Sequence, residues 1–138
     1  MPITKLAVST RNKMAQQIID DLDAGPGPSL LDFYTGTPPA GPDTAITDQI
    51  KLGTLICSDP CATKANGTIT FAAITQDDAA DATGTATWCR QSSSTGTAVA
   101  DHDVTDEAGV GAVKINNIAI ITGGPITMSS LVITIGGA

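Results

Sequence analysis

The sequence STRNKMAQQIIDDLD, residues 9–23, decides how the rest of the chain has to fold. Its apolar side chains follow the spacing of one helical face: Met14, Ala15, Ile18, Ile19 and Leu22. A single amphipathic helix is not stable alone in water, so this face must pack on another apolar surface. Because the remaining chain offers only short β-strand patterns, we predict a β structure with one helix docked on it.

Residue types at both ends of this segment favour a helix of this length. Ser9 or Thr10 can cap its start, because a short hydroxyl side chain can accept a hydrogen bond from a free N–H of the first turn. Gly25 can take the left-handed conformation that ends a helix, and Pro26 and Pro28 prevent it from continuing.

The charges along this helix run against its dipole. Basic residues stand near its start and acidic residues near its end: Arg11, Lys13, Asp20, Asp21 and Asp23. Each such charge is locally unfavourable, because the helix dipole is positive at its start and negative at its end. Two interpretations remain open, namely solvated charge that a stable fold tolerates, or helix ends that face charges on a partner.

The overall charge is strongly asymmetric. The chain has 138 residues, enough for one domain, and a net charge of −7. Lys5, Arg11 and Lys13 give residues 1–19 a charge of +3 and leave −10 for the remainder. An acidic body argues against nucleic-acid binding, because phosphate contacts require clustered Lys and Arg.

The sequence has neither an apolar run long enough to span a membrane nor a signal-peptide pattern. Its three cysteines favour a reducing compartment.

From residue 29 onward, short strand-like segments alternate with turns. The predicted strands are residues 30–35, 52–57, 68–74, 85–91, 97–104 (a weak one), 113–121 and 126–135. The last two are the richest in β-branched residues, which suggests the centre of a sheet. Strands at such regular spacing predict an antiparallel β-sandwich or barrel. We expect a single domain over residues 1–138, with an extended arm (1–8), the helix (9–24) and strands (29–135).

One loop region can carry contacts with a partner. Residues 36–44, GTPPAGPDT, form a proline-rich loop that is too stiff for regular structure and suits contact with a neighbour. Asn66-Gly67 marks a tight turn.

Trp88 and Tyr34 are the side chains suited to stacking on a sugar, although Trp88 is better interpreted as the largest piece of the core.

The metal-ligating residue types are present without a convincing pattern. Cys57, Cys61, Cys89 and His102 have the chemistry of zinc ligands, but the last two lack a paired spacing, so buried thiols are the simpler interpretation. A disulfide between Cys57 and Cys61 on oxidation is the alternative.

An acidic segment supplies oxygen ligands in a poor arrangement for calcium. Its members are Asp101, Asp103, Asp106 and Glu107, and the glycine and glutamate of a calcium loop are missing from the sixth and twelfth positions. Whether Asp101, Asp103 and Asp106 bind a cation stays open at this point. No G-x-S-x-G motif accompanies His102, so we predict no enzyme activity, no cofactor and no metal.

Four segments carry a resemblance to a known family. They are LAVSTRNKMAQQIIDDLDAG (6–25), LLDFYTGTPP (30–39), SDP (58–60) and GTATWCR (84–90). The chain resembles the capsid cement, or decoration, proteins of tailed double-stranded DNA phages. This resemblance implies an antiparallel, jelly-roll-like β-sandwich on the capsid exterior. The protein would be made in the host cytoplasm, bind the major capsid protein and pair as a homodimer. No catalytic residue is implied.

The expected role is therefore a virion structural protein that stabilises contacts between major capsid subunits without chemistry. Nucleic acid and membrane are not expected partners. The predicted contacts with the capsid are Lys5, Arg11, Lys13, Thr37, Pro38 and Pro39, together with the edge of the C-terminal strand. The alternative is another virion component, such as a tail or fibre module with a glycan-binding β-sandwich.

Overall fold

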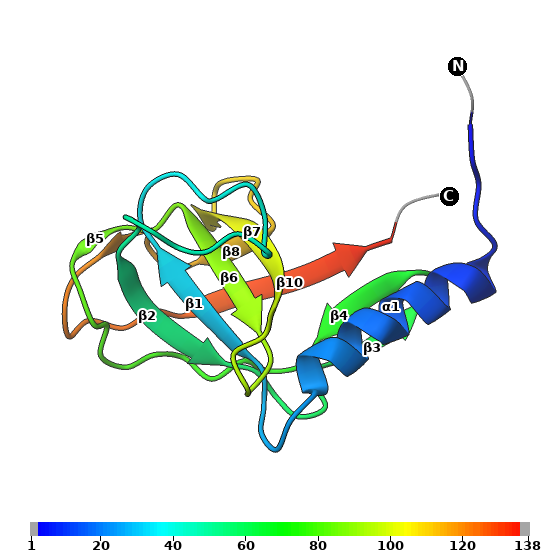
Figure 1. Ribbon diagram of the computed structural model, residues 1–138. Coiled ribbons are helices and arrows are strands. Elements are labelled where there is room, and N and C mark those ends of the chain that lie inside the picture. Colours follow the sequence, from blue (N-terminus) through cyan, green and yellow to red (C-terminus); the bar gives the residue numbers. More distant parts are fainter. Residues whose placement is uncertain (1–2, 136–138) are drawn as a thin grey trace.

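A computed structural model describes residues 3–135 (Figure 1). This part of the chain contains one α-helix, α1 (Val8–Asp23), and ten β-strands. The strands are β1 (Leu30–Tyr34), β2 (Lys51–Ile56), β3 (Ala62–Ala65), β4 (Thr68–Phe71), β5 (Gly84–Thr85), β6 (Trp88–Ser92), β7 (Ala98–Asp106), β8 (Val113–Ile115), β9 (Ala119–Ile120) and β10 (Met128–Thr134). The prediction of a mainly β chain with one N-terminal helix is confirmed.

Eight strands form one curled sheet, and β5 pairs with β9 apart from it. The order in the large sheet is β2-β1-β6-β7-β8-β10-β4-β3. Every neighbouring pair in this sheet is antiparallel except β7 and β8, which run parallel. The architecture is therefore a mixed, half-barrel sheet. The prediction of a wholly antiparallel arrangement is wrong at this pair, and two stacked sheets of a jelly roll are not confirmed.

The parallel pair depends on a short loop that doubles back along β7. Val104 pairs with Val113, so residues 107–112 must bring the chain back to a position beside Val104 before β8 begins. Thr105 Oγ1 accepts a hydrogen bond from the Gly111 N–H at 3.1 Å, and Asp103 Oδ1 accepts one from the Ala112 N–H at 2.9 Å. Side chains of β7 thus satisfy the loop's backbone groups, which a structureless connection would leave unpaired.

A segment after β4 closes the open side of the half-barrel. Ile56 of β2 forms a bridge with Thr75, and Asp77 forms one with Ile126, just before β10. Asp77 also accepts a hydrogen bond from the Thr54 N–H through Oδ2 at 3.0 Å. Asp77 therefore fastens the closing segment to β2.

The molecule has two parts (Figure 1). The head comprises β1, β2, the strands from β5 to β9, and the beginning of β10. The extension comprises α1, β3, β4 and the end of β10, which leaves the head to pair with β4. One hydrophobic core runs through both parts, since Ala15, Ile19 and Leu22 of α1 belong to the same cluster as the buried side chains of the head.

The turn between β3 and β4 joins three elements of the extension. Asn66 has a φ of 52° and Gly67 one of 76°, the left-handed conformation that a tight hairpin requires. The Gly67 N–H donates to Asn12 Oδ1 of α1 at 2.8 Å, and its carbonyl accepts from the Ile135 N–H at 2.8 Å. The predicted Asn66-Gly67 turn is confirmed, and β3, which was not predicted, is the strand that this turn requires.

The predicted strand 113–121 is interrupted in the structure. Asn116 Oδ1 accepts from the Thr127 N–H at 3.1 Å, and Asn117 Oδ1 accepts from the Ala119 N–H at 2.9 Å. The Asn117 bond, to a backbone group two residues along, is of the local kind that favours a turn over a strand. The segment therefore divides into β8, in the large sheet, and β9, which pairs with β5.

The ends of α1 differ in part from the prediction. The residue before the helix is Ala7, and no side chain caps the start, so the predicted Ser9 or Thr10 cap is wrong. Instead the Arg11 N–H reaches the Ala7 carbonyl at 3.0 Å, and Ser9 and Thr10 lie inside the first turn. At the other end Gly25 has the expected positive φ, 90°.

Candidate interaction surfaces

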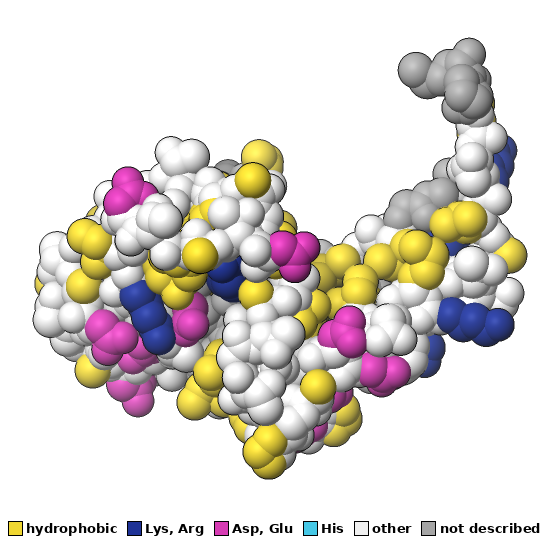
Figure 2. Space-filling model, viewed as in Figure 1, with side chains coloured by type: hydrophobic (Ala, Val, Ile, Leu, Met, Phe, Trp, Pro, Cys, Tyr) yellow, Lys and Arg dark blue, Asp and Glu magenta, His cyan; other side chains and the backbone are white. Residues whose placement is uncertain are grey.

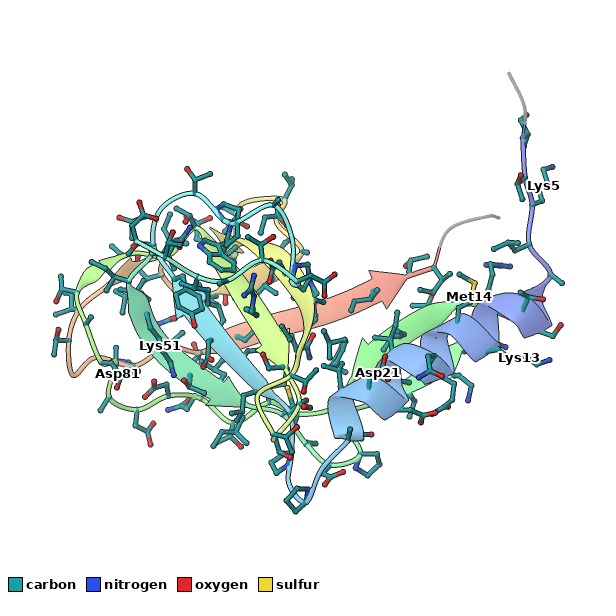
Figure 3. The ribbon with its side chains drawn as sticks, viewed as in Figure 1. Lys5, Lys13, Met14, Asp21, Lys51 and Asp81 are labelled. Atoms are coloured by element: carbon teal, nitrogen blue, oxygen red, sulfur yellow. The ribbon has the colours of Figure 1, made fainter. Side chains whose placement is uncertain are left out.

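The basic residues of the N-terminal region do not share one environment. Lys5 and Lys13 are exposed at the far end of the extension (Figure 3), and we call these two residues the basic tip. Arg11 is only 8% exposed. Its Nε lies 3.3 Å from the Leu6 carbonyl and its Nη1 lies 3.1 Å from the Asn66 carbonyl. Arg11 therefore holds the arm and the β3–β4 turn against α1, a structural role that the sequence did not reveal.

The acidic end of α1 is also used within the chain. Asp23 Oδ1 accepts a hydrogen bond from the Cys61 N–H at 3.0 Å, which ties the helix to the segment that begins β3. Gln16 and Gln17 donate to Asp20 and Asp21 one turn further along. These contacts explain the acidic residues at this end without a charged partner.

The extension carries an apolar surface that its own elements leave partly open. On the extension's sheet, Ile133 is paired with Ile69, and Ile69 with Lys64, so all three side chains point to one face. This is the face that α1 covers, because Lys64 Nζ contacts Gln16 Oε1 at 2.6 Å. However, α1 lies over β3 and β4, and β10 is the third strand of this face.

The flank of α1 that turns toward β10 is apolar as well. Met14 and Ile18 lie on the opposite side of the helix from Gln16, which faces β3. Met14 is 44% exposed, and it projects from the upper side of α1 in Figure 3. We call the resulting surface the apolar ledge; its members are Met14, Ile18, Ile133 and Ile135. Figure 2 shows hydrophobic atoms gathered along this side of the extension, above α1.

The proline-rich loop lies on the outer face of the head and is held at several points. Thr87 Oγ1 donates to the Gly36 carbonyl at 2.5 Å, and Arg90 Nη2 donates to the Gly41 carbonyl at 3.0 Å. Within the loop Thr37 and Pro38 are exposed and Pro39 is half-buried. The predicted contact residues of this loop thus lie on the head, apart from the basic tip on the extension.

An aromatic and charged stack lies beneath this loop. The rings of Tyr34 and Trp88 are stacked with centroids 4.8 Å apart, and the Arg90 guanidinium lies 5.5 Å from the Trp88 ring centroid. Arg90 Nε donates to Asp101 Oδ1 at 2.8 Å and Nη2 to Oδ2 at 3.1 Å, and this hydrogen bonding raises the Arg90 pKa. Trp88 is 1% exposed and Tyr34 is 8% exposed, so neither ring forms a platform for a sugar, and the interpretation of Trp88 as core is confirmed.

A pocket of about 400 Å³ opens between this loop and the sheet. Its walls are residues 38–42 on one side and Thr87, Trp88, Asp101, His102 and Asp103 on the other. Trp88 and Asp103 occupy paired positions on β6 and β7, next to the pair formed by Arg90 and Asp101. No local pattern in the sequence indicates this pocket, because it depends on the proline-rich loop folding back over the β6–β7 pair.

The cysteines and the histidine are buried or partly buried. Burial raises the pKa of all three thiols, that of Cys61 to about 12, so they are protonated and poorly reactive near neutral pH. Gln91 lies between Cys57, at 3.8 Å from Sγ, and His102, whose Nε2 is 3.0 Å from Gln91 Oε1. Among residues 3–135, no three His, Cys, Asp or Glu side chains are placed to hold a metal ion.

The acidic segment after Asp101 has partners within the chain. Asp101 pairs with Arg90, Asp103 accepts from Ala112, and Asp106 Oδ1 accepts from the N–H groups of Ala108 and Gly109, both at 3.1 Å. These carboxylates therefore shape the loop after β7.

Comparison with known proteins gives no assignment. No family model, no curated protein and no solved structure matches the chain. In the part of the chain that the structure describes, no helix is long and apolar enough to cross a membrane.

Proposed function

We propose that this chain is a non-catalytic virion structural protein that binds the outer surface of a phage head and stabilises contacts between major capsid subunits. The observation that supports this proposal most is the extension, where the apolar ledge lies on the same projecting unit as the basic tip. An apolar surface rimmed by polar residues is typical of a site of protein contact.

The two kinds of side chain have separate parts in this contact. A partner that covers the ledge removes apolar surface from water, and this burial favours binding by about 25 cal/mol per Å². Lys5 and Lys13 attract acidic groups on the partner and are screened by salt. Each copy needs only a modest affinity, because many copies act together on one shell.

Finer features of the proposal come from the resemblance to cement proteins. They are the jelly-roll topology, the homodimer, the major capsid protein as partner and the position on the capsid exterior. A glycan-binding role is less well supported, because Tyr34 and Trp88 are covered.

Co-sedimentation with mature capsids that lack a cement protein tests the proposal. We expect saturable binding at a fixed ratio to the capsid subunit, with an affinity that falls as salt rises. Folded protein that stays in the supernatant with its cognate capsids at low salt would refute the proposal.

A further inference from the structure

The pocket under the proline-rich loop has an unmatched negative charge. Along the β6–β7 pair, the Arg90–Asp101 position holds a guanidinium and a carboxylate in contact. The neighbouring position pairs Asp103 with Trp88, and no Lys or Arg within residues 3–135 forms an ion pair with Asp103. Asp103 is exposed, and its Oδ1 accepts the Ala112 N–H, so its second oxygen is available to a ligand.

The other groups around the pocket increase this imbalance. Asp43, at the end of the loop, interacts electrostatically with Arg90. Asp43 and Asp101 therefore both act on the Arg90 guanidinium, and Asp103 adds a third carboxylate without a cation of its own. A cationic ligand is favoured here and an anionic one is opposed.

The walls restrict the kind of cation. Pro38, Pro39 and Pro42 give the loop side of the pocket rigid apolar surfaces, and the buried Trp88 lies at the sheet side. A ligand that fits both walls and carboxylates has an apolar stem and a charged head. Arginine suits this better than lysine, because its planar guanidinium is more weakly hydrated and offers several donors to carboxylate and carbonyl oxygens.

We propose that this pocket binds an arginine side chain of a partner protein, with its stem along the loop prolines and its guanidinium on Asp103. The inference deepens the proposed function, since the same loop carries Thr37, Pro38 and Pro39. The partner's arginine extends the row that Arg90 and Asp101 begin.

The test uses nuclear magnetic resonance of the isotope-labelled whole chain. The probe is N-acetyl-arginine methylamide, and N-acetyl-citrulline methylamide is the uncharged control of the same shape. Trp88 is the sole tryptophan, so its indole N–H, which donates to the Thr35 carbonyl at 3.1 Å, gives a single resolved reporter. We expect the arginine probe to shift this signal and the amides of Ala40, Gly41 and residues 101–103, and the citrulline probe to leave them unchanged.

Two variants sharpen the result. In Asp103→Asn the side-chain oxygen can still accept from Ala112, so the loop is retained while the charge is lost. We expect it to bind the arginine probe about five-fold more weakly, the upper range for one partly exposed ion pair. The matched control is Asp106→Asn, which removes an exposed carboxylate with the same kind of turn contacts outside the pocket, and it should bind as the native chain does.

Several outcomes would overturn the inference. They are shifts confined to other acidic sites such as residues 77–81, equal binding of citrulline, or equal binding of the corresponding lysine probe. If Asp103→Asn disturbs the fold, the residues whose signals shift in the native chain still show whether the arginine probe binds in this pocket. This experiment contains no capsid, so its result is independent of the co-sedimentation result. Arginine binding without capsid binding would support this site and refute the proposed function. Capsid binding without arginine binding would refute this site and leave the proposed function standing.

Discussion

Arg11 shows how one residue can connect elements that are far apart in sequence. Its guanidinium contacts the carbonyls of Leu6 and Asn66, one before the helix and one in the β3–β4 turn. A cation at the start of a helix interacts unfavourably with the helix dipole. Here the guanidinium is placed against two backbone carbonyl oxygens, which compensate for this interaction. The position of the charge is therefore explained by a contact inside the chain.

Removing this side chain should destabilise the extension. We expect Arg11→Ala to lower the free energy of unfolding by about 2 kcal/mol, because hydrogen bonds to a charged group are lost. Arg11→Lys should cost less, since it retains one donor site. Lys13→Ala, an exposed change on the same helix, should stay within about 0.5 kcal/mol. Urea unfolding followed by circular dichroism measures all three; equal stability of Arg11→Ala and Lys13→Ala would contradict the assigned role.

His102 should make stability depend on pH. Burial lowers its pKa below 6.5, against the opposing effect of Asp101 and Asp103. As the pH falls below about 6.5, the unfolded chain takes up a proton that the folded chain resists, so the free energy of unfolding falls. The loss is limited to about 1.4 kcal/mol per pH unit and ends at the folded pKa.

His102→Asn provides the control for this prediction. The variant has no imidazole to titrate, so its stability should be flatter than that of the native chain between about pH 7 and 5. Parallel stability profiles for the two proteins in this range would show that His102 does not carry the effect.

At the scale of elements, the β3–β4 turn holds the extension together. Gly67 has a φ of 76°, and a Cβ there would lie 3.0 Å from the Arg11 Cβ and 3.3 Å from the Ile135 carbonyl oxygen. An L-residue would thus be strained by its backbone and crowded by two other elements.

Gly67→Ala separates these two costs when it is compared with Gly96→Ala. Gly96 has a φ of 89°, but a Cβ there meets no atom within 4 Å. We expect Gly96→Ala to cost about 1 kcal/mol from backbone strain alone, and Gly67→Ala to cost more. Thermal or urea unfolding measures the loss of stability in each variant. Equal losses would mean that crowding by the neighbours of Gly67 adds nothing to the backbone strain.

Local patterns predicted some of these elements well. The helical face of residues 9–23 and the Asn66-Gly67 turn depend on neighbouring residues, and both are present. The weak strand predicted over residues 97–104 corresponds to β7 (Ala98–Asp106), which pairs with β6 on one side and β8 on the other. Its alternating charged residues hid this, because a strand's central place depends on partners far away in sequence.

Other features could not be predicted because they arise only in three dimensions. The break at Asn116 and Asn117 had a local signal, whereas the parallel pairing of β7 with β8 did not. Parallel neighbours normally need a crossover of a dozen or more residues, and here residues 107–112 suffice. The pocket and the apolar ledge likewise depend on which strands become neighbours, so neither could be read from spacing.

At the scale of the whole molecule, charge and apolar surface are distributed unevenly. The basic tip lies at the far end of the extension, and most of the acidic residues lie on the head (Figure 2). The apolar ledge lies between them, on the extension. A partner that engages the extension therefore meets apolar and basic groups together, which is the central claim of the proposed function.

The most direct test compares two charge insertions in the co-sedimentation assay. Met14→Asp places a carboxylate on the apolar ledge, whereas Val110→Asp places one on the head at a side chain that is 96% exposed. Both change the net charge equally. We expect Met14→Asp to weaken capsid binding about ten-fold or more, since the ledge would have to bury a charge, and Val110→Asp to bind as the native chain does. Equal binding of the two folded variants would contradict the claim that the extension is a docking surface.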